Sequence, residues 1–176
     1  MQYKTTIGAD FLTKELDLNG TIVQLQLWDT AGQEKFHSMG ASFYRNSECC
    51  VLVCDLTEPK SFDTLENWRT EFLTKLNPKE PDTFPFVLLG NKSDLTEERK
   101  VSNDDIKKYC EKNKNMPYFE TSAKDNSGVE NAFKEIASLA FQRNNKNEDY
   151  DYIPQTPMNL NLKSNQETKR RCCNNN

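Results

Sequence analysis

The sequence lacks the features that mark membrane-spanning, secreted and nucleic-acid-binding proteins. No apolar run approaches the ~18 residues needed to span a bilayer, and the start lacks the charged-then-apolar pattern of a secretory signal. The formal net charge is -4, so the chain has no excess of Lys and Arg with which to displace the counterions of a nucleic acid. These absences predict a cytosolic protein that does not bind nucleic acid.

The chain also lacks a disulfide framework and has little histidine. Its six cysteines lie in an apolar run (Cys49, Cys50 and Cys54), in a helical pattern (Cys110) and side by side near the end (Cys172 and Cys173). Cysteines in apolar runs usually behave as small buried hydrophobes, which favours a reducing environment. The single histidine, His37, is predicted to face solvent rather than to relay protons.

The patterns that are present predict one domain of strands and helices. The chain has 176 residues, 35% of them hydrophobic, which is enough for a single core. Residues 11–28 form two segments on either side of the turn signal Asn19–Gly20, and the apolar Val23, Leu25 and Leu27 alternate with polar neighbours, as is typical of a β-hairpin. Apolar runs predict buried parallel strands at 49–57 and 84–94 and a short strand at 117–123. Helical spacing predicts a crossover helix at 62–76 and two more helices at 101–110 and 127–143.

This order of elements predicts a doubly wound α/β fold. The domain is expected to cover residues 1–143, and residues 144–176, which are rich in Asn and Lys and lack periodicity, are expected to form a flexible tail. Residues 28–47 are polar and rich in small side chains, which predicts a loop with a short helix. Ligands of such sheets bind outside the carboxyl ends of the strands, so the loops there are the candidates for chemistry.

Three of these loops have unusual content: "DTAG" (29–32), "NKSD" (91–94) and "TSAK" (121–124). Each alone is more typical of an ordinary turn or strand end. Three in this order, each after an apolar strand, favour a nucleotide site. The carboxylate of Asp94 is a candidate guanine reader, because it can accept two parallel hydrogen bonds and guanine offers an N1–H beside an exocyclic N2–H.

The neighbours of Asp94 have candidate roles at the same base. Asn91 either pairs with another base edge or ties the loops together, and the stems of Lys92 and Lys124 are placed to cover the ring faces. A backbone N–H near Ala123 suits the guanine O6.

The first loop has candidate roles at the phosphates. Gly32 permits close approach of the backbone to a phosphate, and Asp29 is a candidate magnesium ligand through water. Gln33 is placed to orient an attacking water, as a glutamine does in phosphoryl-transfer enzymes.

The chain resembles the Rab-family small GTPases from about Gln2 to Arg143. The resemblance rests on "IGADF", "LQLWDTAGQEKF", "FYRNS", "LVCDLT", "LLGNKSD" and "ETSAK". Within that family, "QYKTTIGADFLTKE" and "NPKEPDTFPFVLLGNKSDL" resemble the seventh-numbered subfamily, which serves late endosomes, lysosomes and phagosomes.

The resemblance implies a role for each matching residue, with GTP or GDP and Mg2+ as cofactors. It implies a magnesium-ligating, γ-phosphate-sensing Thr6, metal and phosphate contacts at Asp29 and Gly32, and a catalytic Gln33. It implies base readers at Asn91, Lys92 and Asp94, and a loop of Ser122, Ala123 and Lys124 that closes over guanine. Phe11, Trp28 and Phe43 would form the aromatic surface that effectors read, although core packing is an equal alternative for Trp28 and Phe43.

One element of the family pattern does not occur in this sequence. The string GxxxxGK[ST], which the family places in a strand-loop-helix unit of roughly 30 residues ahead of the matched segment, is not found. In the family, this unit would supply about five charge-assisted contacts to the phosphates, each worth roughly 1.5–3 kcal/mol. Losing them would cost about 10 kcal/mol, so we expect weak GTP binding, micromolar or worse. We also expect the recorded chain, an incomplete gene model or a truncated isoform, to be unstable or aggregation-prone in isolation, because two apolar strand edges would face a gap.

The last residues, "KRRCCNNN", predict a lipid anchor. In a Rab-like chain, Cys172 and Cys173 look like the dual geranylgeranylation site, and the preceding Lys169, Arg170 and Arg171 would add attraction to anionic lipid. The three final Asn residues depart from the usual family ending, which places the cysteines at or within a residue of the end.

Two functions are therefore predicted. The first is a GTP-hydrolysing switch at the cytoplasmic face of late endosomal and lysosomal membranes, with a cytosolic pool. The second is a binding module that engages Rab partners without cycling GTP. The resemblance implies as partners effectors, an exchange factor, a GTPase-activating protein, an escort protein or GDP-dissociation inhibitor, and a prenyl transferase.

Overall fold

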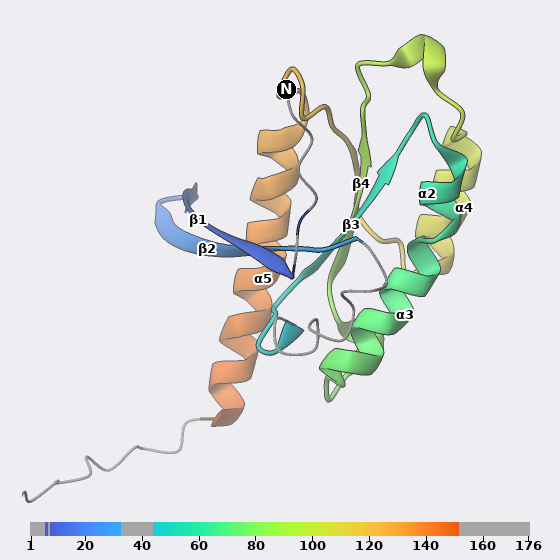
Figure 1. The fold of residues 1–176 in the computed structure, drawn as a ribbon. Coiled ribbons are helices and arrows are strands. Elements are labelled where there is room, and N and C mark those ends of the chain that lie inside the picture. Colours follow the sequence, from blue (N-terminus) through green and yellow to red (C-terminus); the bar gives the residue numbers. More distant parts are fainter. Residues whose placement is uncertain (1–5, 7, 33–43, 152–176) are drawn as a thin grey trace, which may run out of the picture.

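The computed structural model describes Thr6, residues 8–32 and residues 44–151, the last five by their backbone alone. The elements, in chain order, are β1 (Ala9–Leu18), β2 (Thr21–Thr30), β3 (Cys50–Asp55), α2 (Pro59–Asp63), α3 (Leu65–Leu76), β4 (Phe86–Asn91), α4 (Asn103–Lys112), β5 (Tyr118–Glu120) and α5 (Val129–Asp151). Short 3-10 turns occur at Pro81–Thr83 and Thr96–Glu98. Figure 1 shows their arrangement in space.

Strands β1 and β2 form the predicted hairpin. They pair antiparallel, with Leu18 opposite Thr21. The turn residues Asn19 and Gly20 have φ values of 54° and 90°, as a two-residue turn that matches strand twist requires. The carboxylate of Asp17 accepts a 2.6 Å hydrogen bond from the Gly20 N–H. The hairpin prediction is confirmed.

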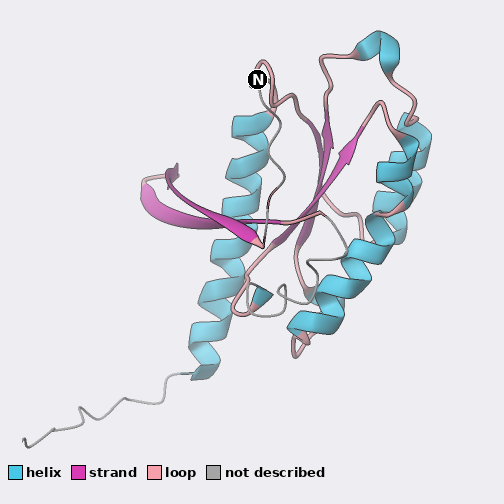
Figure 2. Cartoon of the chain, in the orientation of Figure 1, coloured by secondary structure: helices cyan, strands magenta, loops and turns pink. Residues whose placement is uncertain are grey.

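Strands β3, β4 and β5 form a parallel sheet in that order, with helices on both faces. Strand β4 is buried on both sides: Phe86 and Leu88 belong to the core under α3 and α4, and Val87 and Leu89 to the core under α5. Figure 2 shows α5 on one side of the strands and α2, α3 and α4 on the other. The predicted doubly wound α/β class is confirmed.

The crossover between β3 and β4 contains two helices where the sequence predicts one. The chain enters α2 at Pro59, whose fixed φ suits the first helical position, and α2 ends before Thr64. The Thr64 hydroxyl donates to the Ser61 carbonyl at 3.0 Å, and its backbone ψ of -7° lies toward the edge of the right-handed helical region. Helical hydrogen bonds still cross this position, from the Thr64 N–H to the Lys60 carbonyl and from the Trp68 N–H to the Thr64 carbonyl, both at 3.2 Å, so α2 and α3 are separated by a one-residue irregularity.

Helix α5 is longer than the sequence predicts. It continues past Arg143 to Asp151, so the predicted domain boundary at 143 falls inside the helix. The apolar stripe fades there, but extending an existing helix adds one hydrogen bond per residue and needs no further burial. Helix α5 thus ends beyond the predicted boundary, and the boundary of the domain itself stays a prediction.

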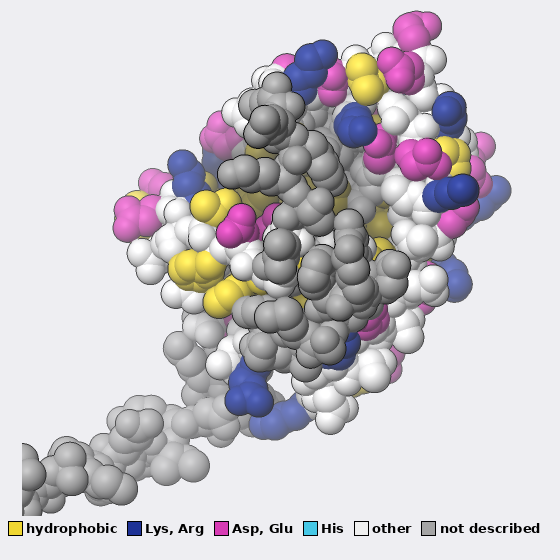
Figure 3. Space-filling model, in the orientation of Figure 1, with side chains coloured by type: hydrophobic (Ala, Val, Ile, Leu, Met, Phe, Trp, Pro, Cys, Tyr) yellow, Lys and Arg dark blue, Asp and Glu magenta, His cyan; other side chains and the backbone are white. Residues whose placement is uncertain are grey.

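The hairpin and the parallel sheet are two separate sheets. Among the described residues, β1 pairs with β2, and no strand pairs with β3 on the side away from β4. The hairpin exposes Phe11, Leu12, Ile22 and Trp28, and Val53 on β3 is 54% exposed. Figure 3 shows apolar side chains gathered on the hairpin.

Candidate functional site

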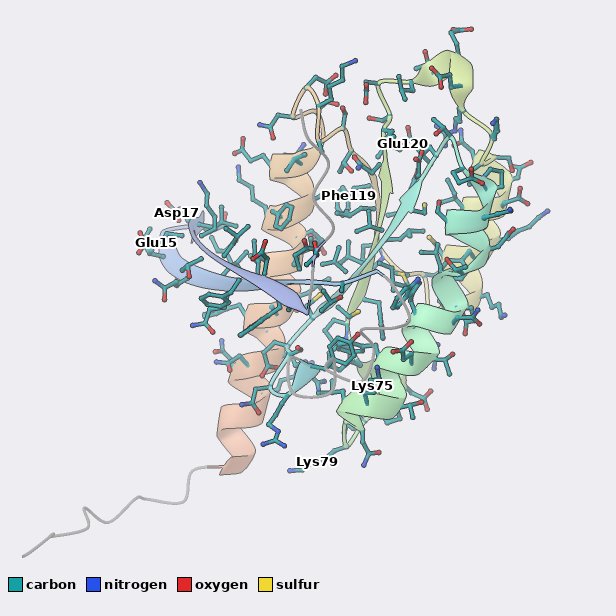
Figure 4. All side chains as sticks on the ribbon, viewed as in Figure 1. Glu15, Asp17, Lys75, Lys79, Phe119 and Glu120 are labelled. Carbon is teal, nitrogen blue, oxygen red and sulfur yellow. The ribbon has the colours of Figure 1, made fainter. Side chains whose placement is uncertain are left out.

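The three parallel strands end in polar residues at one edge of the sheet. The last residues of β3, β4 and β5 are Asp55, Asn91 and Glu120. The register pairs Asp55 with Asn91 and Gly90 with Glu120, so these ends lie side by side. Figure 4 labels Glu120 near this edge. The sheet therefore brings the NKSD and TSAK loops together, where an α/β sheet binds its ligand.

Hydrogen bonds join these two loops into one unit. The buried Ser122 hydroxyl donates to Asp94 Oδ1 at 2.6 Å, and the Ala123 N–H donates to Asn91 Oδ1 at 3.1 Å. Main-chain bonds add to this, from the Ser93 N–H to the Thr121 carbonyl at 3.1 Å and from the Thr121 N–H to the Gly90 carbonyl at 2.8 Å. Of the two roles predicted for Asn91, the structure shows the one that ties the loops together. The N–H expected to face guanine O6 is donated to Asn91.

The carboxylate of Asp94 is held ionised and in a fixed orientation. The hydrogen bond from Ser122 and the nearby ammonium of Lys124 keep the pKa of Asp94 below its usual range. Its second oxygen, Oδ2, lies 3.6 Å from Lys124 Nζ. The side chain of Asp94 is 13% exposed, and that of Lys124 is 79% exposed. Asp94 thus presents a charged acceptor whose orientation does not depend on a ligand.

The ammonium of Lys92 is paired with a residue outside both loops. Lys92 Nζ lies 2.6 Å from Asp55 Oδ2. Burial alone would raise the pKa of Asp55, but the hydrogen bonds from Lys92 and Thr57 outweigh it and lower that pKa. The same hydrogen bond and charge raise the pKa of Lys92. Lys92 and Asp55 are therefore both charged over the whole neutral range.

The structure brings together two oxygen donors suited to magnesium. Thr6 Oγ1 donates to Asp29 Oδ2 at 3.4 Å, and the Ala31 N–H donates to the Gly8 carbonyl at 2.9 Å, which fixes this segment beside the end of β2. No atom of the described residues lies within 4 Å of the position where a Cβ would stand on Gly32. No cluster of three or more His, Cys, Asp or Glu side chains that could hold a metal occurs in the described part of the chain. These residues fit a magnesium ion that keeps most of its positions for phosphate and water.

The remaining predicted residues divide into two groups. Phe11 and Trp28 pack together on the hairpin, with ring centroids 4.8 Å apart and exposures of 46% and 47%. In the described structure, Trp28 is thus an exposed residue of the hairpin, and its role at an effector surface stays a prediction. Gln33, Phe43, Cys172 and Cys173 lie outside the described residues.

Sequence reasoning missed the residues that support the two loops. Arg99 donates to Glu120 Oε1 at 2.8 Å, and the Tyr118 hydroxyl donates to the same oxygen at 3.1 Å. Asp55 was also missed. It ends the apolar run of β3, much as Asp29 comes near the end of β2, and that position is the signal that would have identified it.

Comparison with known proteins agrees with this geometry. Residues 1–142 match the model of the Ras family. The chain is 53% identical to "Ras-related protein Rab7" of Cenchrus ciliaris over 157 residues, which is 88% of this chain and 75% of that protein. It is 52% identical to "Ras-related protein Rab-7a" of Paramecium octaurelia over 139 residues, 79% of this chain and 68% of that protein. It is also 52% identical to "Ras-related protein RABG3d" of Arabidopsis thaliana over 88% of this chain and 75% of that protein.

The chain therefore belongs to the Ras family of small GTPases, and within it to the Rab7-like proteins. The resemblance drawn from the sequence is confirmed. Proteins of this family bind GTP and GDP with Mg2+ and interact with effectors, exchange factors, GTPase-activating proteins and GDP-dissociation inhibitors. In the described part of the chain, no helix is both long enough and apolar enough to cross a bilayer.

Proposed function

We propose that this protein is a guanine-nucleotide switch that hydrolyses GTP and regulates vesicle traffic to late endosomes, lysosomes or phagosomes. The observation that supports the nucleotide site most directly is the union of its two base loops. Asp94 is fixed by Ser122, and Asn91 is fixed by Ala123, at the carboxyl edge of a parallel sheet. A carboxylate that is ionised and held in place selects a base with adjacent N–H donors, and guanine has them.

In this proposal, each loop contributes to one part of the nucleotide. Asp94 accepts from the guanine N1–H and N2–H, and the stems of Lys92 and Lys124 lie over the faces of the ring. Thr6 and Asp29 would hold a magnesium ion, which would neutralise charge on the phosphates. Gly32 lets the backbone approach the γ-phosphate, and Gln33 orients the attacking water.

The cellular part of the proposal rests on the relatives and on the end of the chain. The relatives carry Rab7 names, which supports action at late endosomal and lysosomal membranes. Geranylgeranyl groups on Cys172 and Cys173 would anchor the protein on the cytoplasmic face, because two lipid chains hold stably where one does not. A prenyl transferase and an escort protein would serve these cysteines, and effectors would read Phe11, Trp28 and Phe43.

A change of base preference tests the nucleotide site. Binding of GDP, ADP and XDP to the full chain and to Asp94→Asn is measured by calorimetry at nucleotide concentrations up to the millimolar range. We expect the unsubstituted chain to prefer GDP. We expect Asp94→Asn to lose about 10- to 100-fold in GDP affinity and to prefer XDP, since its amide donates to the xanthine C2 carbonyl.

The matched control is Asp125→Asn, which removes the same charge from an exposed carboxylate in the neighbouring loop. Its preference for GDP should not change. Failure of the unsubstituted chain to bind GDP, or equal GDP binding by Asp94→Asn, would contradict the proposal.

A further inference from the structure

The carboxylate of Asp55 is held by fixed partners on both of its oxygens. Its Oδ1 accepts from the Thr57 N–H at 2.8 Å and from the Thr57 hydroxyl at 2.7 Å. Its Oδ2 lies 2.6 Å from Lys92 Nζ. The backbone of Asp55 is fixed as well, because its N–H donates to the Ser61 hydroxyl at 2.9 Å. Asp55 is therefore a rigid negative charge at the end of β3, one strand away from the base loops.

Lys92 is drawn to this charge from a loop with an unusual backbone. Its φ is 64°, in the left-handed region, and it directly follows Asn91, whose carbonyl accepts from the Leu56 N–H at 3.0 Å. The ion pair between Lys92 and Asp55 joins the loop after β4 to the loop after β3. It fixes the ammonium end of a side chain that would otherwise be free to move in solvent.

The pairing also separates the two lysines of the site. Three carboxylates interact with Lys92: Asp55, Asp94 and Glu98. Asp55 holds Lys92, and Asp94 has Lys124 as its nearby cation. Without Asp55, the ammonium of Lys92 would face Asp94 and Glu98 instead. An ammonium bound to Asp94 would compete with the N–H groups of a guanine base.

We propose that Asp55 is a positioning residue of the nucleotide site, which holds Lys92 beside the base and keeps its ammonium away from Asp94. This inference rests on the proposed binding of guanine nucleotides. A purely structural role would need the ion pair to stabilise the fold, but the side chain of Lys92 is 51% exposed and such pairs contribute little to stability. The effect of Asp55 should therefore be seen in nucleotide binding rather than in melting.

The test is a double-mutant cycle with the full chain, using Asp55→Asn, Lys92→Met and both together, with GDP as the probe. Asn keeps the oxygen that accepts from Thr57 and removes the charge that holds Lys92. We expect Asp55→Asn to weaken GDP binding by about 5- to 10-fold when Lys92 is present and by less than about twofold in the Lys92→Met background, because residues in direct contact are coupled. The matched control is Glu98→Gln, which removes an exposed carboxylate that also interacts with Lys92. Its GDP affinity should match that of the unsubstituted chain.

A second measurement follows the ammonium group itself. In nitrogen-15 spectra of the side-chain NH3 groups, Lys92 should give a sharp signal that is lost in Asp55→Asn and kept in Glu98→Gln. GDP binding by the unsubstituted chain with equal losses in both Lys92 backgrounds overturns this inference and leaves the proposed function standing. Absence of GDP binding by the unsubstituted chain overturns both. A Lys92 signal unchanged by Asp55→Asn also overturns the inference.

Discussion

Gly90 is closely packed against Leu56 and Tyr118 beside the site, so we predict that Gly90→Ala destabilises the protein. Gly90 is the next-to-last residue of β4 and directly precedes Asn91, the first residue of the NKSD loop. A Cβ there would lie 2.7 Å from the Tyr118 hydroxyl oxygen and 2.9 Å from Leu56 Cδ2. Leu56 is fully buried and cannot move aside, so the Tyr118 ring would have to shift by about 1 Å to restore ordinary contact. Overpacking of this kind costs about 2 kcal/mol, or about 4–8 °C in Tm for a chain of this size.

The assay is a urea titration followed by tryptophan fluorescence, in a buffer with sucrose, which favours the folded state. Tyr118→Phe removes the obstructing oxygen, so the double variant should be more stable than the sum of the single effects predicts. Gly32→Ala is the matched control: its Cβ would meet no atom of the described residues within 4 Å, so its stability should not change, while its affinity for GTP should fall. If Gly90→Ala unfolds at the same urea concentration as the unsubstituted chain, or if adding Tyr118→Phe does not restore stability, a clash at Gly90 is excluded.

Three further predictions follow from the described contacts and from the end of the sequence. Asp94 has a lowered pKa, so its hydrogen bond from Ser122 stabilises the fold above the ordinary aspartate pKa and is lost as the pH falls through the lowered value. Ser122→Ala should therefore lower Tm more at pH 7 than at pH 3, and equal losses at both pH values would refute this. Val53→Lys, on the edge of β3 that no described strand pairs with, should reduce light scattering on heating without lowering Tm; unchanged scattering would show that this edge does not drive aggregation. Substitution of Cys172 and Cys173 by Ser should move the protein from the membrane to the soluble fraction, and continued membrane association would contradict the lipid anchor.

Local signals predicted the elements that local chemistry determines. The Asn19–Gly20 turn needs positive φ at both positions, and few other residue pairs supply it so readily. Strand β4 reads as a continuous apolar run because both of its faces are covered. In the same way, the position of the NKSD and TSAK loops directly after predicted strands identified them as candidate site segments. These predictions needed only the period of the apolar residues and the position of each loop.

What the sequence could not give depends on contacts between segments. The pairing of Asp55 with Lys92 follows from the register of β3 with β4 and from the left-handed backbone of Lys92, and neither is visible in a string of residues. The irregularity at Thr64 coincides with a hydroxyl bond to a carbonyl three residues back, which the sequence pattern does not show. The donation of the Ala123 N–H to Asn91 likewise depends on how two loops meet. Composition marked the change after Arg143 but could not show that the helix continues through it.

The proposed site residues are distributed between the two sheets of the structure. Asp94, Asn91 and Ser122 extend from the parallel sheet, where β4 is buried on both faces and the loops are bonded to each other. Thr6, Asp29 and Gly32 belong to the hairpin side, which shares no strand pairing with that sheet among the described residues. A nucleotide bound at its base by the first group and at its phosphates by the second would therefore connect the hairpin to the parallel sheet. Because Phe11 and Trp28 lie on the hairpin, the phosphate end of the ligand would control the position of the surface proposed for effectors.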